Sequence, residues 1–378
     1  MKILFITRYI TDSGVATHML TLGKEFVNRN HEVAVLSGGA KADVRETTTS
    51  LIDDFHQQEI KTYETLFPKR KRNKYIEFFR FIIALPHALY CIRKFKPDII
   101  HVHWPLTSFV AKIYQKLYKI PFIMTFHLAN TPNTIFHQPA NGVIAISSQL
   151  KKEIIENFGY SKDSVYLVYN GVERQSFQRN EDKKQQDKKA LGLDENISTI
   201  TFVGSFEKRK GLDILFNACE KVTEDVPPFQ ILLAGEGDRN WINELADKHN
   251  MTGRVKMFSF QSPQKFYNVA DVFVLPSRQE GFGLVVIEAM LMKTPVIRSN
   301  TEGAEDQIVH GQDGLLFENE NAGDLAAKLK KLLNDKELRE KLGKNAELKA
   351  EQFFTSSTMA EKTLEAYNDV LKKSKTQS

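Results

Sequence analysis

Short apolar runs that favour β-strands alternate with helical stretches along most of this sequence. In the first half a helix is expected at Thr17–Asn28, and the strand-like runs are Lys2–Thr7, His31–Leu36, Ile99–Val102, Phe122–Thr125, Val143–Ile146 and Val165–Tyr169. Strands that alternate with helices form βαβ units, in which the strands pair in parallel. The alternation therefore predicts an α/β fold with a parallel sheet.

The second half repeats the same alternation. Its expected strands are Ile200–Val203, Ile231–Leu233, Val255–Phe258, Val272–Leu275, Pro295–Ile297 and Gly314–Phe317. Between the halves, Glu173–Lys189 is polar and rich in Lys, Gln and Asp, which is typical of a linker. Because a chain of 378 residues commonly forms two domains, we expect two doubly wound, Rossmann-like domains. We place them at residues 1–175 and 191–352, with a polar linker at 176–190.

Composition is that of a globular chain that folds in water, with 42% apolar and 26% charged residues. The two cysteines, Cys91 and Cys219, suggest neither a disulfide framework nor a zinc site, so a reducing cytoplasm is expected. The opening apolar run is too short for a signal-peptide core and is interpreted as the first strand. The net charge of +5 favours anionic partners or merely aids solubility. No signature of nucleic-acid binding accompanies it, so no nucleic-acid partner is expected.

A basic cluster, Lys69–Lys74, precedes an aromatic-rich stretch, Tyr75–Ile83. The uncharged segment Phe81–Ile92 is too short to cross a bilayer. Two interpretations remain open. The cluster and the aromatic helix could rest on an anionic membrane surface, which would make the protein peripheral on the cytoplasmic face. Alternatively, the segment is a buried helix beside a solvated basic turn.

The most specific motif is a pair of glutamates separated by seven residues, Glu280 and Glu288. Glu280 follows the expected strand Val272–Leu275, and Glu288 lies on the apolar helix that comes next. Ligands of open α/β sheets bind beyond such strand ends. The glycines Gly281 and Gly283 expose backbone N–H groups at a helix start, which suits a phosphate. The motif therefore predicts binding of a phosphorylated sugar, although the helix dipole alone also favours carboxylates at this position.

Two other loops and the ends of two further strands carry candidate site residues. Gly14 lies between the first strand and the first helix, where a ligand can approach the backbone. Arg209 and Lys210 occupy the equivalent loop of the second half and can offset the charge of a diphosphate, or they form a solvated basic turn. His127 and His103 end two strands; they either line a sugar or acceptor site or pack within the core.

Taken in this order, the motifs resemble those of the retaining glycosyltransferases of family four, which have the GT-B fold. The Glu-x7-Glu element with Pro276-Ser277 before it is the most specific part. Supporting motifs are Val203-Gly204, Lys210-Gly211, Leu233-Ala234-Gly235-Glu236-Gly237, Ala270-Asp271-Val272 and Asn170-Gly171-Val172. The resemblance covers nearly the whole chain.

The resemblance implies specific roles on the donor side. Glu280 would contact hydroxyls of the donor sugar, Glu288 would bind the nucleotide ribose, and Lys210 would bind the diphosphate. Further donor-binding residues would be Gly14, Ser205, Arg209, Gly235, Phe260, Gly281, Phe282, Gly283 and Leu284. Phe260 would lie beside the base, and backbone N–H groups from Gly281 to Leu284 would hold the sugar and the phosphates.

On the acceptor side, His127 would approach the sugar from the first domain, with His103 near it. The final segment, residues 353–378, has apolar residues at helical spacing and would cross back onto the first domain. Three departures from the family pattern are Ser205 in place of arginine, Val15 in place of a second glycine, and the loop Glu302–Asp306. Arg209 is the candidate substitute at the first of these.

The predicted function is retaining transfer of a hexose or N-acetylhexosamine from a nucleotide-diphosphate donor, UDP-linked, to a glycan or lipid-linked acceptor of the cell envelope. No Asp-x-Asp element stands at a strand end, so neither a metal nor another cofactor is expected. The alternatives are a non-catalytic nucleotide-sugar-binding partner subunit and a glycan phosphorylase, for which no pyridoxal-phosphate lysine motif is found. A membrane-surface or nucleic-acid module would rest on the basic cluster alone.

Overall fold

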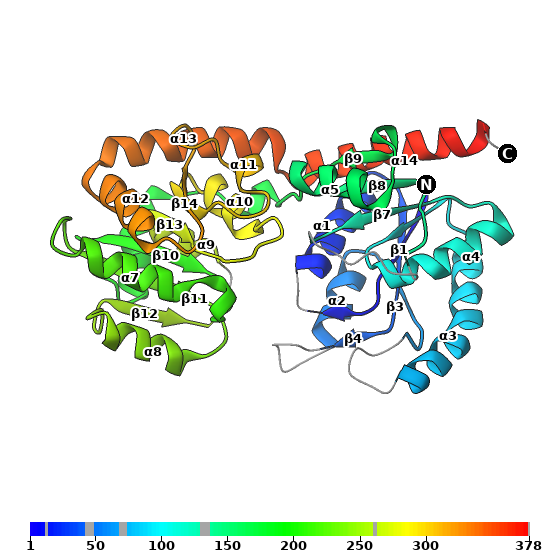
Figure 1. The fold of residues 1–378 in the computed structure, drawn as a ribbon, viewed down its shortest axis with the longest axis horizontal. Helices are drawn as coiled ribbons and strands as arrows, with labels where there is room; N and C mark the ends of the chain where they lie inside the picture. The colour runs from blue at the N-terminus through cyan, green and yellow to red at the C-terminus, as the bar shows by residue number, and fades with distance from the viewer. Residues whose placement is uncertain (12–13, 42–48, 68–73, 129–136, 260–262, 377–378) are drawn as a thin grey trace. The chain divides into compact units, whose positions relative to one another are not determined.

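The computed structural model describes residues 1–11, 14–41, 49–67, 74–128, 137–259 and 263–376. The chain forms two compact units, and each has its own sheet (Figure 1). Unit 1 comprises residues 1–171 and 356–378, and unit 2 comprises residues 172–355. The chain therefore passes from one unit to the other at two places, Gly171–Val172 and Thr355–Ser356.

Unit 1 is built on a parallel sheet of seven strands in the order β5-β3-β1-β6-β7-β8-β9. The strands are β1 (Lys2–Ile6), β3 (Glu32–Ser37), β5 (Lys61–Glu64), β6 (Ile99–Val102), β7 (Phe122–Phe126), β8 (Gly142–Ala145) and β9 (Val165–Leu167). A separate short pair joins β2 (Ile10–Thr11) to β4 (Ala40–Lys41). Strand β1 lies beside both β3 and β6, so the order of the strands reverses there.

Unit 2 has a parallel sheet of six strands in the order β12-β11-β10-β13-β14-β15. Its strands are β10 (Ser198–Val203), β11 (Phe229–Ala234), β12 (Val255–Phe258), β13 (Val272–Leu275), β14 (Val296–Ser299) and β15 (Leu315–Phe317). This is the 3-2-1-4-5-6 strand order of a Rossmann fold. The reversal lies between β10 and β13, and the loops that follow these two strands therefore meet at one edge of the sheet.

Helices connect the strands of each unit. Those of unit 1 are α1 (Gly14–Asn28), α2 (Thr49–Gln57), α3 (Lys74–Phe95), α4 (Ser108–Tyr118), α5 (Ser148–Phe158) and α14 (Ser356–Thr376). Those of unit 2 are α6 (Glu181–Ala190), α7 (Leu212–Val222), α8 (Arg239–Lys248), α9 (Gln264–Val269), α10 (Leu284–Leu291), α11 (Ala304–Gln307), α12 (Ala322–Asn334) and α13 (Lys336–Phe353). In Figure 1, α3 and α4 lie on one side of β1 and β3, and α1 and α2 lie on the other.

The expected strands are confirmed, with ends that differ by no more than two residues. Helix α1 begins at Gly14, three residues before the expected start at Thr17. Strand β5 was not expected, because its sequence Lys-Thr-Tyr-Glu carries a charge at each end. It is the edge strand of its sheet, where charged residues are common because they discourage pairing with another chain.

The expected linker at residues 176–190 is largely wrong, because Glu181–Ala190 forms α6 and belongs to unit 2. The Asn180 side chain caps the helix by accepting from the Lys183 N–H at 3.0 Å. Lys184 and Lys188 both pair with Asp271, with N–O distances of 2.8 and 3.6 Å. Lys188 also donates to the carbonyl of Ile197 at 2.8 Å. Polar composition therefore concealed a helix that is attached through its charges rather than through an apolar face.

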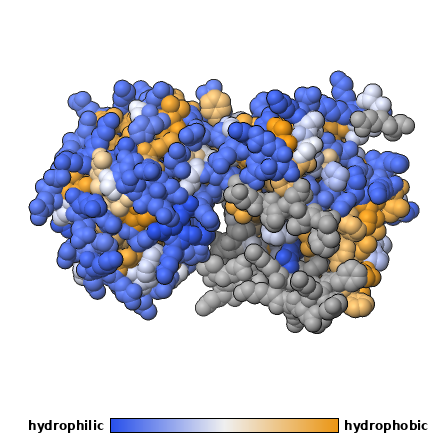
Figure 2. Space-filling model, viewed as in Figure 1, coloured by the Kyte–Doolittle hydropathy of each residue, from blue (hydrophilic) through white to orange (hydrophobic). Residues whose placement is uncertain are grey.

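Helix α3 has apolar residues on both its buried face and its exposed face. The buried face carries Ala84, Ala88, Cys91, Ile92 and Phe95. On the opposite face Phe79, Ile82, Ile83 and Tyr90 are all exposed and recur at helical spacing. We call these four residues the α3 apolar stripe. Figure 2 shows hydrophobic residues gathered over this helix. The basic cluster next to it, residues 69–73, lies outside the described residues.

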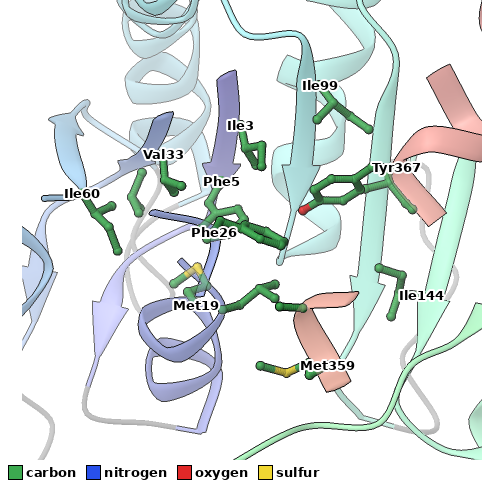
Figure 3. Close-up of a cluster of buried hydrophobic side chains, with 14 of the residues drawn as sticks. Ile3, Phe5, Met19, Phe26, Val33, Ile60, Ile99, Ile144, Met359 and Tyr367 are labelled. Carbon is green, nitrogen blue, oxygen red and sulfur yellow. The ribbon is translucent and has the colours of Figure 1, made fainter. Parts of the chain in front are cut away.

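The last helix, α14, belongs to unit 1 and completes its core (Figure 3). Met359 and Tyr367 of α14 pack with Phe5, Met19 and Phe26 from β1 and α1. The rings of Phe26 and Tyr367 lie 5.7 Å apart. The Tyr367 hydroxyl, which would be costly to bury alone, lies 2.6 Å from the Nδ1 atom of buried His101.

Candidate active site

The loops that follow β10 and β13 bring Lys210 and Glu280 together. These residues are 70 positions apart, yet the Lys210 Nζ atom lies 2.6 Å from the Glu280 Oε2 atom. Both side chains are largely buried, with 12 and 13% exposed. Since β10 and β13 are neighbours, the ion pair lies at the reversal of the sheet, where open α/β folds bind ligands.

Glu280 is ionised in this site. Burial works to raise the pKa of its carboxyl, but Lys210, Arg298 and Arg209 outweigh burial and bring the pKa below its ordinary value. The Ser277 hydroxyl also donates to Glu280 Oε2 at 3.3 Å. A carboxylate held in this form can accept hydrogen bonds and carry charge, but it cannot supply a proton near neutral pH.

Two glycines give the loops their close approach. Gly211 has φ +71°, and a Cβ atom there would lie 2.0 Å from the Pro276 carbonyl oxygen. Gly235 allows a similar approach after β11, because its Cβ would lie 1.9 Å from the carbonyl oxygen of Gly204. Any larger residue at either position would force the loops apart. Gly235 therefore shapes the loop that carries Ser205, whatever further contact it makes.

The N-terminus of α10 adds positive potential beside Glu280. Its cap residue is Gly283, with φ +76°, and no side chain of the described residues caps the helix. Leu284 begins the helix and Phe282 is buried, so the turn Gly281–Gly283 presents backbone toward the loop edge. Uncapped N–H groups at a helix start attract anions. Together with Lys210 they provide positive potential of the kind that suits an anion such as a phosphate.

A buried arginine that the sequence analysis missed supports this turn. Arg298 is 0% exposed and lies near the end of β14. Its guanidinium donates to the carbonyl oxygens of Phe282 at 3.4 Å and of Glu302 at 3.2 Å, and also to Gln307. Gln307 in turn donates to the Gly283 carbonyl at 3.3 Å. The available signal was one charged residue inside the apolar run Val296–Ser299.

Glu288 lies on α10, one turn into the helix. Its Oε2 atom accepts a hydrogen bond of 2.6 Å from the Tyr267 hydroxyl. Burial raises the pKa of Glu288 to about 7, although the bond from Tyr267 opposes the shift. Glu288 and Glu280 therefore differ in ionisation, because only Glu280 has cations beside it.

The other residues predicted on the donor side differ in their burial and in their partners. The Ser205 hydroxyl is buried and has no hydrogen-bond partner among the described residues. Arg209 is half exposed and pairs with Glu207 at 2.6 Å, so it faces solvent more than Lys210 does. Phe260 lies outside the described residues.

In unit 1, His127 and His103 follow neighbouring strands, β7 and β6. The His103 Nδ1 atom lies 3.1 Å from the His127 Nε2 atom. His127 is partly exposed, whereas His103 is only 2% exposed. His101, which precedes them on β6, is wholly buried between Thr125 and Tyr367 and therefore packs within the core. Gly14 is exposed at the start of α1.

Two Rossmann-like domains, each on a parallel sheet, are the architecture of the GT-B glycosyltransferases. Residues 183–349 match the family model described as glycosyl transferases group 1. Residues 13–176 match the model described as glycosyltransferase family 4. The chain therefore belongs to the group 1 glycosyltransferases, and its first half matches glycosyltransferase family 4.

Individual proteins that resemble this chain are also glycosyltransferases. The chain is 33% identical over 246 residues to the capsular polysaccharide biosynthesis glycosyltransferase CapM of Staphylococcus aureus, covering 62% of this chain and 63% of that relative. It is 28% identical over 286 residues to a D-inositol 3-phosphate glycosyltransferase of Corynebacterium aurimucosum, covering 68% of each. Its fold matches the crystal structure of Anabaena Alr3699/HepE in complex with UDP. That match has a TM-score of 0.83 at 19% identity and covers 98% of this chain and 100% of that one.

Proposed function

We propose that this protein transfers a sugar from a nucleotide-diphosphate donor to a hydroxyl acceptor, with retention at the anomeric carbon. The donor class is a UDP-linked hexose or N-acetylhexosamine. The acceptor is a glycan or lipid-linked intermediate of the cell envelope. The similarity to CapM of Staphylococcus aureus, a glycosyltransferase of capsular polysaccharide biosynthesis, supports that acceptor class.

The observation that carries the proposal is the Lys210–Glu280 ion pair beside the uncapped start of α10. Lys210 and the helix N-terminus supply fixed positive charge for a diphosphate leaving group. Charge stabilisation of this kind is usually the largest single contribution to catalysis. Glu280 is ionised and lies next to that charge, so it can accept hydrogen bonds from sugar hydroxyls and orient the ring.

The same arrangement suits a reaction without a metal ion. Glu280, the carboxylate nearest the phosphate site, is occupied by Lys210, and the cations of the site are side chains of the protein. The proposal gives His127 a role at the transferred sugar and gives no side chain the role of covalent nucleophile. We expect transfer to continue at its full rate in excess EDTA.

The proposed function is tested by incubating the full chain with a panel of nucleotide sugars and following its melting temperature and the release of free nucleotide. A ligand at 100 times its Kd stabilises the folded state by about 2.7 kcal/mol, so a true donor should stand out. Binding without turnover in the presence of envelope acceptors would favour the partner-subunit alternative. If no nucleotide sugar raises the melting temperature, the proposed function is wrong.

Donor binding should weaken as the pH falls through 7, because of Glu288. The ribose hydroxyls donate to the ionised carboxylate, and this form is lost when Glu288, whose pKa is about 7, takes up a proton. Affinity for UDP-glucose should be about tenfold lower at pH 6 than at pH 8, following the fraction of ionised carboxylate. Calorimetric titration checks this, since the diphosphate of UDP-glucose is esterified at both ends and does not titrate here.

The matched control is Glu288→Gln, which keeps the shape of the side chain but cannot ionise. This variant should bind UDP-glucose weakly, with an affinity that no longer changes between pH 6 and pH 8. If the variant shows the same pH dependence as the unmodified protein, another group is responsible.

We also propose that the α3 apolar stripe rests on a lipid surface at the cytoplasmic face, which would bring unit 1 to a lipid-linked acceptor. No helix in the described ranges is long and apolar enough to cross a membrane. The support is the stripe itself, Phe79, Ile82, Ile83 and Tyr90, which leaves four large apolar side chains in water. Exposed Arg93 and Lys94 follow it on the same helix, and they suit anionic headgroups.

Vesicle sedimentation provides the test. The full chain should bind vesicles that contain anionic phosphatidylglycerol, and Ile82→Ser/Ile83→Ser should reduce that binding at least about tenfold, because each buried CH2 is worth about 0.8 kcal/mol. The control is Leu348→Ser, which removes an exposed apolar side chain from α13 instead and should leave vesicle binding unchanged. Equal binding by all three proteins would contradict a role for the stripe.

A further inference from the structure

Three histidines gather at the reversal of the unit 1 sheet. His18 lies on α1, directly after β1 and its loop, and His103 and His127 follow β6 and β7. One ring nitrogen from each lies within 4.8 Å of those of the other two. Strands β1, β6 and β7 are neighbours, so the three side chains come together at the carboxyl edge of the sheet. We call them the histidine cluster.

The nitrogens of the cluster lack enough partners within the protein. Among the described residues, both ring nitrogens of His18 and the Nε2 atom of His103 are buried without a hydrogen bond. Asn170 lies near His18 and slightly favours its protonated form, but its Oδ1 atom also makes no hydrogen bond of normal geometry. Leaving a buried polar group without a partner destabilises the folded state, so packing alone explains this arrangement poorly.

Each imidazole is in the form that binds metals. Burial lowers the pKa of His18, His103 and His127, which favours the neutral form of each ring. Neutral imidazoles with available lone pairs are ligands for Zn²⁺ and its neighbours, whereas Mg²⁺ prefers oxygen.

We propose that the histidine cluster binds one Zn²⁺ ion, or a similar nitrogen-preferring divalent cation, through His18, His103 and His127. Zn–N bonds of 2.0–2.1 Å in a tetrahedron hold ligand nitrogens about 3.4 Å apart. The His103 Nδ1–His127 Nε2 distance is already 3.1 Å, so His18 makes the larger adjustment. The fourth position is left for water on the side of His127, the partly exposed member.

The surroundings supply the outer contacts that metal-binding histidines need. Asn170 can accept from the ring N–H of His18 once the other nitrogen binds the ion. His101 supports His103 from behind, with ring centroids 4.1 Å apart, and is itself fixed by Tyr367 and Thr125. These contacts hold the rings in place without a carboxylate.

Occupation of the cluster would affect activity in one direction. Because the proposed function assigns His127 to the transferred sugar, a bound Zn²⁺ should inhibit transfer, and Mg²⁺ should not. That consequence rests on the proposed function. The binding site itself does not, so it is tested without any nucleotide sugar.

The test uses the untagged full chain, stripped with a chelator and dialysed. Titration with Co²⁺ should give the visible absorption of a four-coordinate site, saturating at one ion per chain below about 100 µM and displaced by Zn²⁺. His18→Gln should weaken Co²⁺ binding at least about tenfold, since it removes one of three ligands. The matched control, His56→Gln, alters an exposed histidine beside Thr62 and should bind like the unmodified protein.

His127→Gln provides a second variant in case His18→Gln fails to fold. Because His127 is partly exposed, its substitution should disturb the fold less. It should also lose the Co²⁺ absorption. The proposal is overturned if His127→Gln binds as tightly as the unmodified protein, if His56→Gln abolishes binding, or if no ion binds at this concentration. If the unmodified protein binds Co²⁺ as expected but Zn²⁺ does not inhibit its transfer activity, the proposed role of His127 at the sugar is wrong and the metal site stands.

Discussion

Replacing Lys210 with alanine should lower kcat for sugar transfer by about 10²- to 10³-fold, the usual loss when one group that stabilises developing charge is removed. The Lys210 ammonium lies 2.6 Å from Glu280, so its removal deletes the partner of a buried carboxylate and, under the proposed function, a phosphate contact. The measurement is steady-state release of the nucleotide from the donor identified in the screen.

The neighbouring Arg209 provides the matched control. It carries the same charge on the same loop, but it is half exposed and pairs with Glu207. Arg209→Ala should reduce activity less than about tenfold, because an exposed charge is screened by solvent. Equal losses in the two variants would show that general positive charge matters rather than the position of Lys210. An active Lys210→Ala protein would contradict the site.

Glu280→Gln separates orientation from charge stabilisation. The amide keeps the size of the side chain but loses the charge that pairs with Lys210 and that, under the proposed function, strengthens hydrogen bonds from sugar hydroxyls. A role in positioning predicts a lower kcat with little change in UDP affinity, since UDP lacks the transferred sugar. A loss of UDP affinity as large as the loss of kcat would instead assign Glu280 to the diphosphate.

The sequence predicted the parts of this site that depend on local pattern. The alternation of strands and helices placed Lys210 and Glu280 on loops after two strands, and the reversal of strand order brought those loops together. The glycines after Glu280 indicated a helix start because they lie between an expected strand and an apolar helical stretch. Each of these inferences uses residues that are close together in the chain.

What the sequence could not predict depends on contacts between distant segments. The polar run at 181–190 became a helix because Asp271, far along the chain, pairs with two of its lysines. The sequence did not predict a functional role for His18, since a single histidine in a helix forms no recognisable motif. Its position beside His103 and His127 exists only once β1, β6 and β7 are adjacent.

Arg298→Met should destabilise unit 2 by about 3–5 kcal/mol, the cost of removing one partner from a buried charged network. The methionine fills the volume but leaves the carbonyls of Phe282 and Glu302 without their donor in a buried site. Because Gln307 links the same network to Gly283, the turn before α10 should loosen as well. Donor KM should therefore rise together with the loss of stability.

Denaturant unfolding and amide hydrogen exchange provide the readouts, because exchange reports on the Gly281–Gly283 turn separately from global stability. Arg278→Met is the matched control, since Arg278 pairs with Asp213 at 2.7 Å but is 29% exposed. That pair should be worth about 1 kcal/mol or less. Arg298→Lys should fall between, because an ammonium keeps the charge but cannot reach the same set of carbonyls. If Arg298→Met unfolds at the same denaturant concentration as the Arg278 control and its turn exchanges no faster, Arg298 does not position the turn.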